Sequence, residues 1–511
     1  MTFPSQITAS APGPRPSGLV ADATAWLSSV SDQLYGSFLA WILIAVGLYF
    51  TVRTRGVQVR LFGAMVRTVF SSRSSAHHHE EGISSFQAFA IGLASRVGTG
   101  NIVGVALAIT LGGPGAVFWM WVVATVGMAT GFVESTLAQV FKVRHPDGTF
   151  RGGPAYYIER GLGSRTWGCV FAVIITFVFG FAYEATQANA ISSNLQDTFN
   201  VSPWVSAAFL VALTGPIIFR GIKPVARVAE VIAPVMALVY AGMALVILVL
   251  NVDAIPLAFR EIFQGAFGLN QAFAGVSGGL YAAAINGIKR GLFSNEAGEG
   301  SVPNAAATAT TSHPVKQGFI QSMGVFVDTI IVCTATALIV LLSGVYDPAT
   351  ASAGAAATLT SSSMASVLGE WTKYLMTAII FVFAYSSLLG NYTYAEINMD
   401  FLRPSKDGRP KPHYGLRTIV LVATAVGALA SLDLVINLSD VAMGVMAIIN
   451  IVAILALGKW AFGALRDFEA QNRAFKAGEI DHIRFVATDN PNLPGELPGD
   501  VWSADAEHSA G

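Results

Sequence analysis

Four consecutive residues near the middle of a long apolar stretch could bind a small charged ligand. Gly98, Thr99, Gly100 and Asn101 interrupt the hydrophobic run at 86–111. A helix that unwinds there frees main-chain N–H and C=O groups that lipid cannot satisfy, so the break must face a ligand, an ion or a wet cavity. The N–H groups of the first three residues could meet a carboxylate, because the positive end of the following half-helix favours an anion. The freed carbonyls and the Asn101 amide oxygen could face a cation.

A second glycine cluster falls in the apolar run at 262–288 and predicts a second unwound helix. It reads Gly275-Val276-Ser277-Gly278-Gly279, and Ser277 and Gly278 are its candidates for substrate contact. The two interrupted runs each open a block of five helices and point in opposite directions, which is typical of an inverted-repeat secondary transporter. The alternative is that both clusters are close helix crossings, because glycine packs helices together in membranes.

A pair of hydroxyls could hold a cation opposite the first break. Ser386 and Ser387 follow Phe383 by three and four residues, so both hydroxyls and the Phe383 carbonyl share one face of a helix. Sodium prefers hard oxygen ligands of this kind. The alternative is that both serines bond back to the preceding turn of their own helix.

Other polar side chains stand out within apolar runs. Gln187 is near enough to the middle of its helix to reach a central ligand, although a structural hydrogen bond between helices would use it equally well. Arg96 is the one basic residue inside the second run. It could be a gate residue that pairs with an acid such as Glu184 or Asp328. The polar stretch 293–304 is interpreted as a rigid connector, with an inner gate as the alternative.

The composition places these residues in a membrane protein. The chain is 53% hydrophobic and only 12% charged, with a mean hydropathy of +0.58. The net charge of -1 gives no field for gathering nucleic acid, and two cysteines in apolar runs make neither a disulfide framework nor a metal site. We expect an all-α polytopic protein with about eleven transmembrane helices, near 37–53, 86–111, 115–141, 167–192, 204–219, 226–250, 262–288, 317–343, 370–397, 415–432 and 436–460.

The basic residues predict the orientation of these helices. With the N-terminus outside, the cytoplasmic side holds every Lys and Arg except Arg15, Arg96, Arg260 and Lys373. The predicted organisation is an external N-terminal segment (1–36), a first transmembrane helix with a basic cytoplasmic loop (37–83), two five-helix repeats (84–252 and 253–462) and a cytoplasmic C-terminal tail (463–511). The Pro-, Gly- and acid-rich end of that tail, 489–511, is expected to be disordered.

Long blocks of sequence resemble the alanine or glycine:cation symporter family. They are VGTGNIVGVA (97–106), GGPGAVFWMW (112–121), RGGPAYY (151–157), FSNEAGEGSVPN (293–304), Asp328-Thr329 before Cys333-Thr334, and NYTYAE (391–396). The resemblance covers about residues 36 to 460. It implies sodium-driven uptake of alanine, glycine or a close relative, on the five-plus-five inverted-repeat fold that is shared with the neurotransmitter:sodium symporters.

The resemblance also implies roles for particular residues. The carbonyls of Ala94 and Val97 would join Ser386 and Ser387 in one sodium site, with Asn101 at a possible second. Gly98, Thr99, Gly100, Asn101 and Gln187 would contact the substrate. Asn391 belongs with them, and it stands where some members of the family carry Trp.

Other functions remain open from the residues alone. A proton-coupled carrier would need an intramembrane relay, for which Glu134, Glu184, Asp328 and Glu396 are candidates. An ion channel would need repeated filter loops or charged rings that this sequence lacks. The phosphate-loop, nucleophile-elbow and zinc-protease motifs of enzymes are absent, so no enzyme and no cofactor besides Na+ as coupling ion is expected. The resemblance implies a bacterial inner membrane as the location, with the amino acid, Na+ and the bilayer as the partners.

Overall fold

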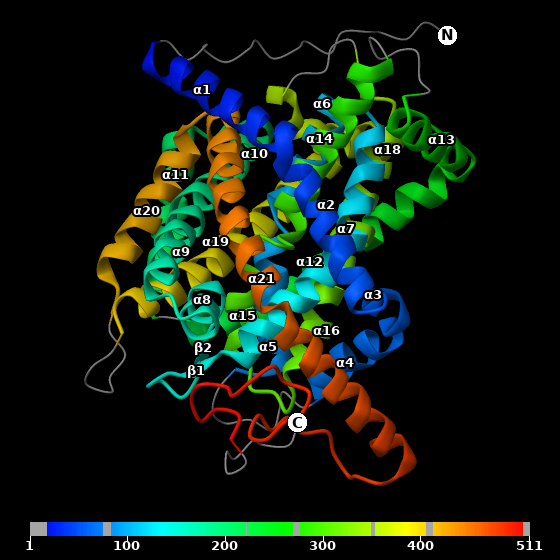
Figure 1. Cartoon of the computed structure of the whole chain (residues 1–511). Coiled ribbons are helices and arrows are strands. Elements are labelled where there is room, and N and C mark those ends of the chain that lie inside the picture. The colour runs from blue at the N-terminus through cyan, green and yellow to red at the C-terminus, as the bar shows by residue number, and fades with distance from the viewer. Residues whose placement is uncertain are drawn as a thin grey trace, which may run out of the picture.

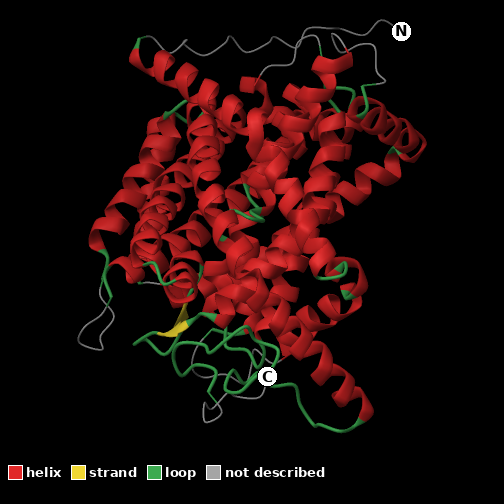
Figure 2. Ribbon diagram, in the orientation of Figure 1, coloured by secondary structure: helices red, strands yellow, loops and turns green. Residues whose placement is uncertain are grey.

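The computed structural model describes residues 18–74, 83–220, 222–268, 276–348, 353–404 and 412–503. Within these ranges the chain is built almost entirely of helices, with one two-stranded hairpin (Figure 1, Figure 2). The predicted all-α class is therefore confirmed. The helices are α1 (Leu19–Leu34), α2 (Ala40–Arg53), α3 (Val57–Arg60), α4 (Phe62–Ser74), α5 (Ser85–Arg96), α6 (Val105–Gly112), α7 (Gly115–Val140), α8 (Pro154–Leu162), α9 (Arg165–Phe177), α10 (Tyr183–Phe199), α11 (Pro203–Ile218), α12 (Ile222–Leu250), α13 (Ile255–Ala266), α14 (Val276–Asn295), α15 (Val302–Thr308), α16 (Pro314–Val325), α17 (Thr334–Leu342), α18 (Ala356–Leu368), α19 (Trp371–Leu402), α20 (Tyr414–Leu429) and α21 (Leu432–Ala477).

Short segments of other geometry join several of these helices. The π-helical segments are Tyr35–Leu39, Gly100–Gly104, Val178–Ala182 and Phe326–Cys333, and the 3-10 turns are Val252–Ala254 and Ala353–Ala355. Strands β1 (Val143–Arg144) and β2 (Phe150–Arg151) pair antiparallel, with Val143 opposite Arg151. Extra residues in a helix are typical of functional sites, and two of the π-helical segments flank the site described below.

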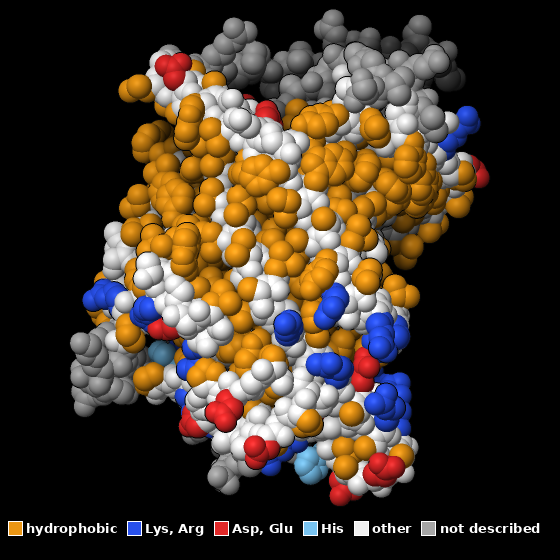
Figure 3. Space-filling view, viewed as in Figure 1, with side chains coloured by type: hydrophobic (Ala, Val, Ile, Leu, Met, Phe, Trp, Pro, Cys, Tyr) orange, Lys and Arg blue, Asp and Glu red, His pale blue; other side chains and the backbone are white. Residues whose placement is uncertain are grey.

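The helices have the length and polarity that a membrane requires. Among the described residues, six helices are long and apolar enough to cross it, or eight if each of two bent pairs makes one span. Two shorter apolar helices are Pro203–Ile218 and Tyr414–Leu429. A broad band of hydrophobic side chains covers the face in Figure 3, with most of its Lys and Arg side chains below that band. Membrane-spanning helices are thus confirmed, whereas the number eleven remains a prediction.

The first predicted break is present between α5 and α6. The two helices bend by 47° at residues 97–99. A capping box starts α5, since the Ser84 hydroxyl accepts from the Gln87 N–H and the Gln87 side chain accepts from the Ser84 N–H. This reciprocal cap fixes where α5 begins, more than two turns before Ala94 and Ser95, which approach the site.

The second predicted break was placed wrongly. Residues 276–279 are the regular first turn of α14, and Gly275 lies outside the described residues. The chain instead unwinds at 296–301, between α14 and α15, where Glu296, Gly298 and Gly300 all have positive φ. In Figure 1, α6 and α14 lie near one end of the molecule, and α5 and α15 near the other. The two broken helices therefore run in opposite directions and pack against each other, α6 on α14 and α15 on α5.

Two basic residues also lie elsewhere than predicted. The sequence placed Lys289 and Arg290 in a cytoplasmic loop, but both are inside α14. The Lys289 ammonium lies 2.8 Å from Asp32 of α1, and the buried Arg290 guanidinium pairs with Asp440 of α21. A charge buried in a helical bundle needs such a partner, and acids from distant parts of the chain supply it.

Helix begins earlier than predicted near the N-terminus, and part of the C-terminal tail is packed against the helices. Helix begins at Leu19, inside the predicted external segment 1–36, and forms one stretch to Arg53. The prediction of disorder is wrong for residues 489–503, because Val501 and Trp502 are buried. The Trp502 indole donates to the Gln139 carbonyl at 2.9 Å, and the Phe485 N–H donates to the Ser312 carbonyl. Residues 504–511 lie outside the described ranges.

Candidate functional site

The break between α5 and α6 forms the centre of the candidate site. Gly98, Thr99, Gly100 and Asn101 are all buried. The Gly98 N–H donates to Asn101 Oδ1 at 3.0 Å, and the Thr99 N–H donates to Gln187 Oε1 at 3.2 Å. The freed N–H groups are thus met by side-chain oxygens. An acceptor such as a carboxylate could replace the Gln187 oxygen at this position.

Neighbouring helices approach Gly98 and Gly100 closely, so that a side chain would overlap a neighbour at Gly98 and would be tightly packed at Gly100. A Cβ on Gly98 would overlap the Ser387 hydroxyl and lie 3.1 Å from Gln187 Oε1. A Cβ on Gly100 would lie 3.1 Å from the Phe293 ring and 3.2 Å from the Ser294 Cα. The break is therefore enclosed by α10, α14 and α19, which is the position that a central ligand site requires.

One of the two predicted hydroxyls joins α19 to the carbonyl end of α5. The Ser387 hydroxyl lies 2.8 Å from the Ala94 carbonyl and 3.1 Å from the Phe383 carbonyl. The Ser386 hydroxyl lies 2.8 Å from the Phe383 carbonyl. The structure thus brings together four of the oxygens expected to bind sodium. The next predicted ligand, the carbonyl of the buried Val97, follows the last turn of α5.

Asn101 also takes part in a second polar cluster, on the other side of the break. Its amide nitrogen lies 2.7 Å from Asp328 Oδ1. The hydroxyls of Ser294 and Thr329 donate to Asp328 Oδ2 at 2.6 and 2.8 Å. All four side chains are buried. The Asp328 carboxylate and the two hydroxyls make a set of hard oxygen ligands that suits a small cation. Asn101 turns its amide nitrogen to this cluster and its oxygen to the Gly98 N–H.

The unwound segment 296–301 brings two carboxylates close to α5 and α10. Glu296 Oε1 and Asn391 Oδ1 each lie 2.9 Å from the Ser95 hydroxyl, and Glu296 Oε2 accepts from the Ser301 hydroxyl. The Glu299 carboxylate lies 3.4 Å from the Tyr183 hydroxyl. Asn391 is therefore linked to the α5 end of the first break and, through Ser95, to the second unwound segment.

Within the described residues, Arg96 forms no ion pair with Glu184 or Asp328, the two acids considered as its partners. The Arg96 guanidinium donates to the carbonyl and the side-chain oxygen of Gln321, both at 3.2 Å, and no carboxylate lies within 4 Å of it among the described residues. Helix α16 packs against α5, and Gly324 stands at the contact. Because glycine has no side chain, the Arg96 guanidinium lies directly against α16. Asp328 bonds to Asn101 instead, and both Glu184 oxygens are buried without a described partner.

Two predicted substrate contacts are not brought to the centre. Gly278 is exposed in the first turn of α14, and a Cβ there would contact nothing within 4 Å. Ser277 stands in the same turn, and its side chain lies outside the described part of the structure. Phe293, Ser294 and Glu296 lie at the site instead, although none of them was among the predicted site residues. Their signal was present, because a polar, glycine-rich stretch directly follows an apolar helix at 293–304.

The chain is similar in sequence to known transporters. The chain is 45% identical over 446 residues to the probable sodium/glutamine symporter GlnT of Bacillus subtilis (strain 168), covering 87% of this chain and 91% of that protein. It is 44% identical over 468 residues to the amino-acid carrier protein AlsT of the same organism, covering 90% and 97%. It is 36% identical over 462 residues to the sodium/alanine symporter AgcS of Methanococcus maripaludis, covering 88% and 100%.

The fold is similar to that of solved transporters. A mutant of the Eremococcus coleocola manganese transporter matches with a TM-score of 0.54 and 13% identity, over 74% of this chain and 79% of that one. At this identity the match concerns the fold alone. In sequence, the model of the sodium:alanine symporter family matches residues 20–482, which include both unwound segments and the hydroxyl pair of α19. The chain therefore belongs to the sodium:alanine symporter family.

Proposed function

We propose that this chain couples the entry of Na+ to the uptake of a small neutral amino acid, alanine or glycine. The observation that carries the proposal is the buried break at Gly98–Asn101, with the Thr99 N–H on Gln187 at one end and the Ala94 carbonyl on Ser387 at the other. N–H donors suit a carboxylate, and carbonyl and hydroxyl oxygens suit a cation. The family membership and the names of the relatives support a sodium-coupled amino-acid carrier.

The proposed binding mode of the substrate follows from the hydrogen bonds at residues 98–101. The carboxylate of the amino acid takes the place of Gln187 Oε1 at the Thr99 N–H, and the released Gln187 amide can donate to it. The Gly98 and Gly100 backbones let the ligand approach because neither carries a Cβ. Asn391 and Phe293 lie next to the break and would limit the size of the substrate side chain.

Two ion sites are proposed beside the substrate. The first uses Ala94, Val97, Phe383, Ser386 and Ser387, as the sequence predicted. The second uses Asn101, Asp328, Ser294 and Thr329, so that Asp328 changes from a candidate gate residue to a candidate ligand. A negative ligand at the second site would compensate much of the cost of a buried cation.

A proton-coupled carrier is the second candidate function, and one observation favours it. Glu184 is fully buried in α10, and neither of its carboxylate oxygens has a described partner. An intramembrane carboxylate of this kind is typical of proton relays. The relative YrbD of Bacillus subtilis (strain 168), 41% identical over 496 residues, bears the name putative sodium/proton-dependent alanine carrier protein.

Competition for uptake tests the proposed substrate. Unlabelled alanine or glycine is expected to compete with radiolabelled alanine at least about ten times better than leucine, because Asn391 and Phe293 are proposed to limit the size of the substrate side chain. The measurement is uptake into proteoliposomes at a fixed Na+ gradient. Competition by glutamine that equals or exceeds competition by alanine would assign this chain the substrate named for its relative GlnT, and equal competition by leucine would indicate a broad carrier.

We also propose that the C-terminus faces the cytoplasm of a bacterial cell. In a variant that lacks Cys169 and Cys333, a cysteine at Asp253 is expected to react with an impermeant maleimide in intact cells, since this exposed residue stands between α12 and α13. A cysteine at Thr488, which is exposed in the C-terminal segment, is expected to react only after permeabilisation. The reverse pattern would invert the proposed topology.

A further inference from the structure

A basic pocket lies at the same end of the molecule as the C-terminal segment, away from the candidate transport site. Its cavity of about 320 Å³ is lined by residues of β1, β2, α8, α9 and the end of α19. Five of these are arginines, against two acids, Glu159 and Asp400. We call this cavity the basic pocket and define it by Arg144, Arg151, Arg160, Arg165 and Arg403.

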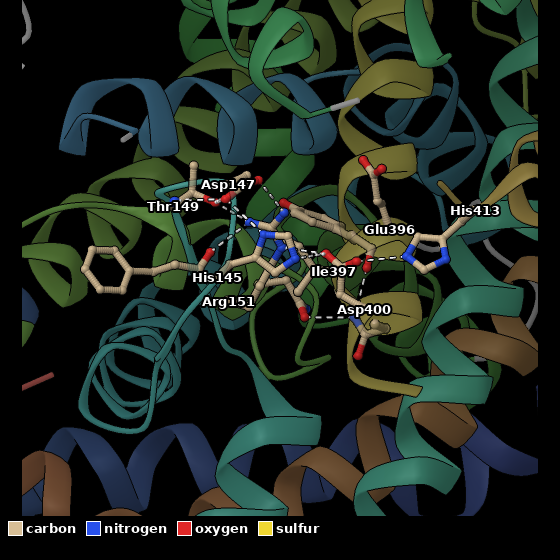
Figure 4. Close-up of polar contacts among 12 residues, drawn as sticks. His145, Asp147, Thr149, Arg151, Glu396, Ile397, Asp400 and His413 are labelled. Atoms are coloured by element: carbon tan, nitrogen blue, oxygen red, sulfur yellow. Dashed lines mark hydrogen bonds and ion pairs between the residues drawn. The ribbon is translucent and has the colours of Figure 1, made fainter. Parts of the chain in front are cut away.

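Arg151 forms ion pairs within the wall of the pocket. The Arg151 guanidinium lies between Asp147, at 3.0 Å, and Asp400, at 2.7 Å, with His413 on the far side of Asp400 (Figure 4). Burial alone would raise the pKa of Asp147, but the contact with His145 and the charge of Arg151 hold that pKa well below its usual range. Asp147 and Arg151 are therefore both charged. The ion pairs of Arg151 with Asp147 and Asp400 join the β1–β2 hairpin to the end of α19.

The remaining arginines have weaker partners or no acidic partner. Arg165 pairs with Glu159 at 2.9 Å, and Arg144 lies 3.9 Å from an exposed carboxylate, that of Asp500. Arg160 donates to the Pro498 carbonyl, and its Nε atom is buried without a described partner. Arg403 is exposed, and the described residues place no carboxylate within 4 Å of it or of Arg160. Arg160 and Arg403 thus line the cavity without an ion pair to a described carboxylate, although the charges of Glu159 and Asp500 act on Arg160 from a greater distance.

The pocket lies where a membrane surface would meet the protein. Helix α9 begins at Arg165 and then exposes large apolar side chains, among them Trp167 at 57%, Val173 at 57% and Phe177 at 46%. Trp is enriched at the boundary between lipid and water, and basic pockets at this level suit anionic head groups. A guanidinium group also matches the geometry of phosphate oxygens.

We propose that the basic pocket binds the phosphate of an anionic phospholipid through Arg160 and Arg403. A soluble phosphate would meet the same guanidinium groups. The apolar face of α9 beside the pocket favours the lipid, because acyl chains can cover Val173 and Phe177 while the head group enters the cavity.

The test titrates the purified full chain in detergent with phosphatidylglycerol and counts bound lipids by native mass spectrometry. The pocket variant combines Arg160→Gln with Arg403→Gln. The control combines Arg67→Gln with Arg473→Gln, which removes the same charge from exposed positions on α4 and α21. We expect the apparent Kd to rise at least about tenfold in the pocket variant and to stay within about twofold in the control. Phosphatidylcholine is expected to bind the unmodified chain at least about tenfold more weakly.

Several results would overturn this proposal. Equal binding of phosphatidylglycerol by the pocket variant and the control would remove Arg160 and Arg403 from the site. Equal binding of the two lipids would remove the role of the negative charge. Displacement of phosphatidylglycerol by millimolar inorganic phosphate would assign the pocket to a soluble anion. If the double variant does not elute as a single species, Arg403→Gln alone must still weaken binding, since this exposed side chain supports no packing.

Discussion

Replacing Gly98 by alanine is expected to reduce alanine uptake to below about a tenth of the unmodified rate. The added methyl group would overlap the Ser387 hydroxyl and lie 3.1 Å from Gln187 Oε1. It would therefore push α19 away from residues 98–101 and occupy space proposed for the substrate carboxylate. Binding of the substrate carboxylate and binding of Na+ beside Ser387 would both be impaired. The measurement is the initial rate of uptake into proteoliposomes at matched protein content.

Gly242→Ala is the matched control for this change. Gly242 is also a glycine within an apolar helix, α12, but it is exposed and a Cβ there would contact nothing within 4 Å. Its uptake should stay close to that of the unmodified chain, and its helix should gain about 0.5–1 kcal/mol. Normal uptake by a well-folded Gly98→Ala protein would show that the ligand does not approach this backbone.

Removing the hydroxyls of Ser386 and Ser387 together is expected to raise the Na+ concentration for half-maximal uptake at least about tenfold. Such a rise corresponds to about 1.4 kcal/mol of lost cation binding. Ser387→Ala alone should carry the larger part, because the Ser387 hydroxyl reaches the Ala94 carbonyl of α5 at 2.8 Å as well as the Phe383 carbonyl of its own helix. The measurement is alanine uptake as a function of Na+ concentration.

Thr393→Val serves as the control for the hydroxyl pair. Thr393 is buried on the same helix, and its hydroxyl donates to the Leu389 carbonyl at 3.3 Å. Its replacement keeps the shape and removes only a bond within the helix, so the Na+ dependence should not change. A Na+ dependence in the double variant that matches Thr393→Val would assign both serines to helix packing and leave the Asp328 cluster as the remaining ion site.

The first break could be predicted because its signal is local. Gly98, Gly100 and Asn101 favour an unwound segment in the middle of a membrane helix. The backbone groups freed there cannot be satisfied by lipid and therefore need another partner. The hydroxyl pair was local too, since the spacing from Phe383 to Ser387 fixes a shared helix face. Both features are where the sequence placed them.

The second break could not be placed in this way. Gly275–Gly279 looked interrupted by composition, yet residues 276–279 are helical. The polar stretch 293–304 was interpreted as a rigid connector from its composition. Its residues 296–301 are buried, and residues far away along the chain satisfy their polar groups. Glu134 of α7 accepts from the Gly298 N–H at 3.2 Å, and Asn450 of α21 donates to the Gly298 carbonyl at 2.9 Å. Such partners lie more than 150 positions away along the chain, and no local pattern reveals them.

The neighbours of Arg96 could not be predicted from the sequence for the same reason. An acid such as Glu184 or Asp328 was one possible partner of this buried charge, and no pairing follows from the sequence. The structure supplies two oxygens of Gln321 instead, and it does so because the small Gly324 lets α16 approach α5. Which neighbour reaches a buried side chain first depends on helix packing and not on the residue itself.

Uptake of radiolabelled alanine under separately imposed gradients tests the central proposal most directly. Purified protein in proteoliposomes would receive an inward Na+ gradient without a pH difference, or an inward proton gradient without Na+. We expect accumulation above the external concentration with the Na+ gradient and none with the proton gradient alone. Accumulation with the proton gradient alone, together with its loss in Glu184→Gln, would contradict sodium coupling and assign the coupling role to the buried carboxyl group of α10.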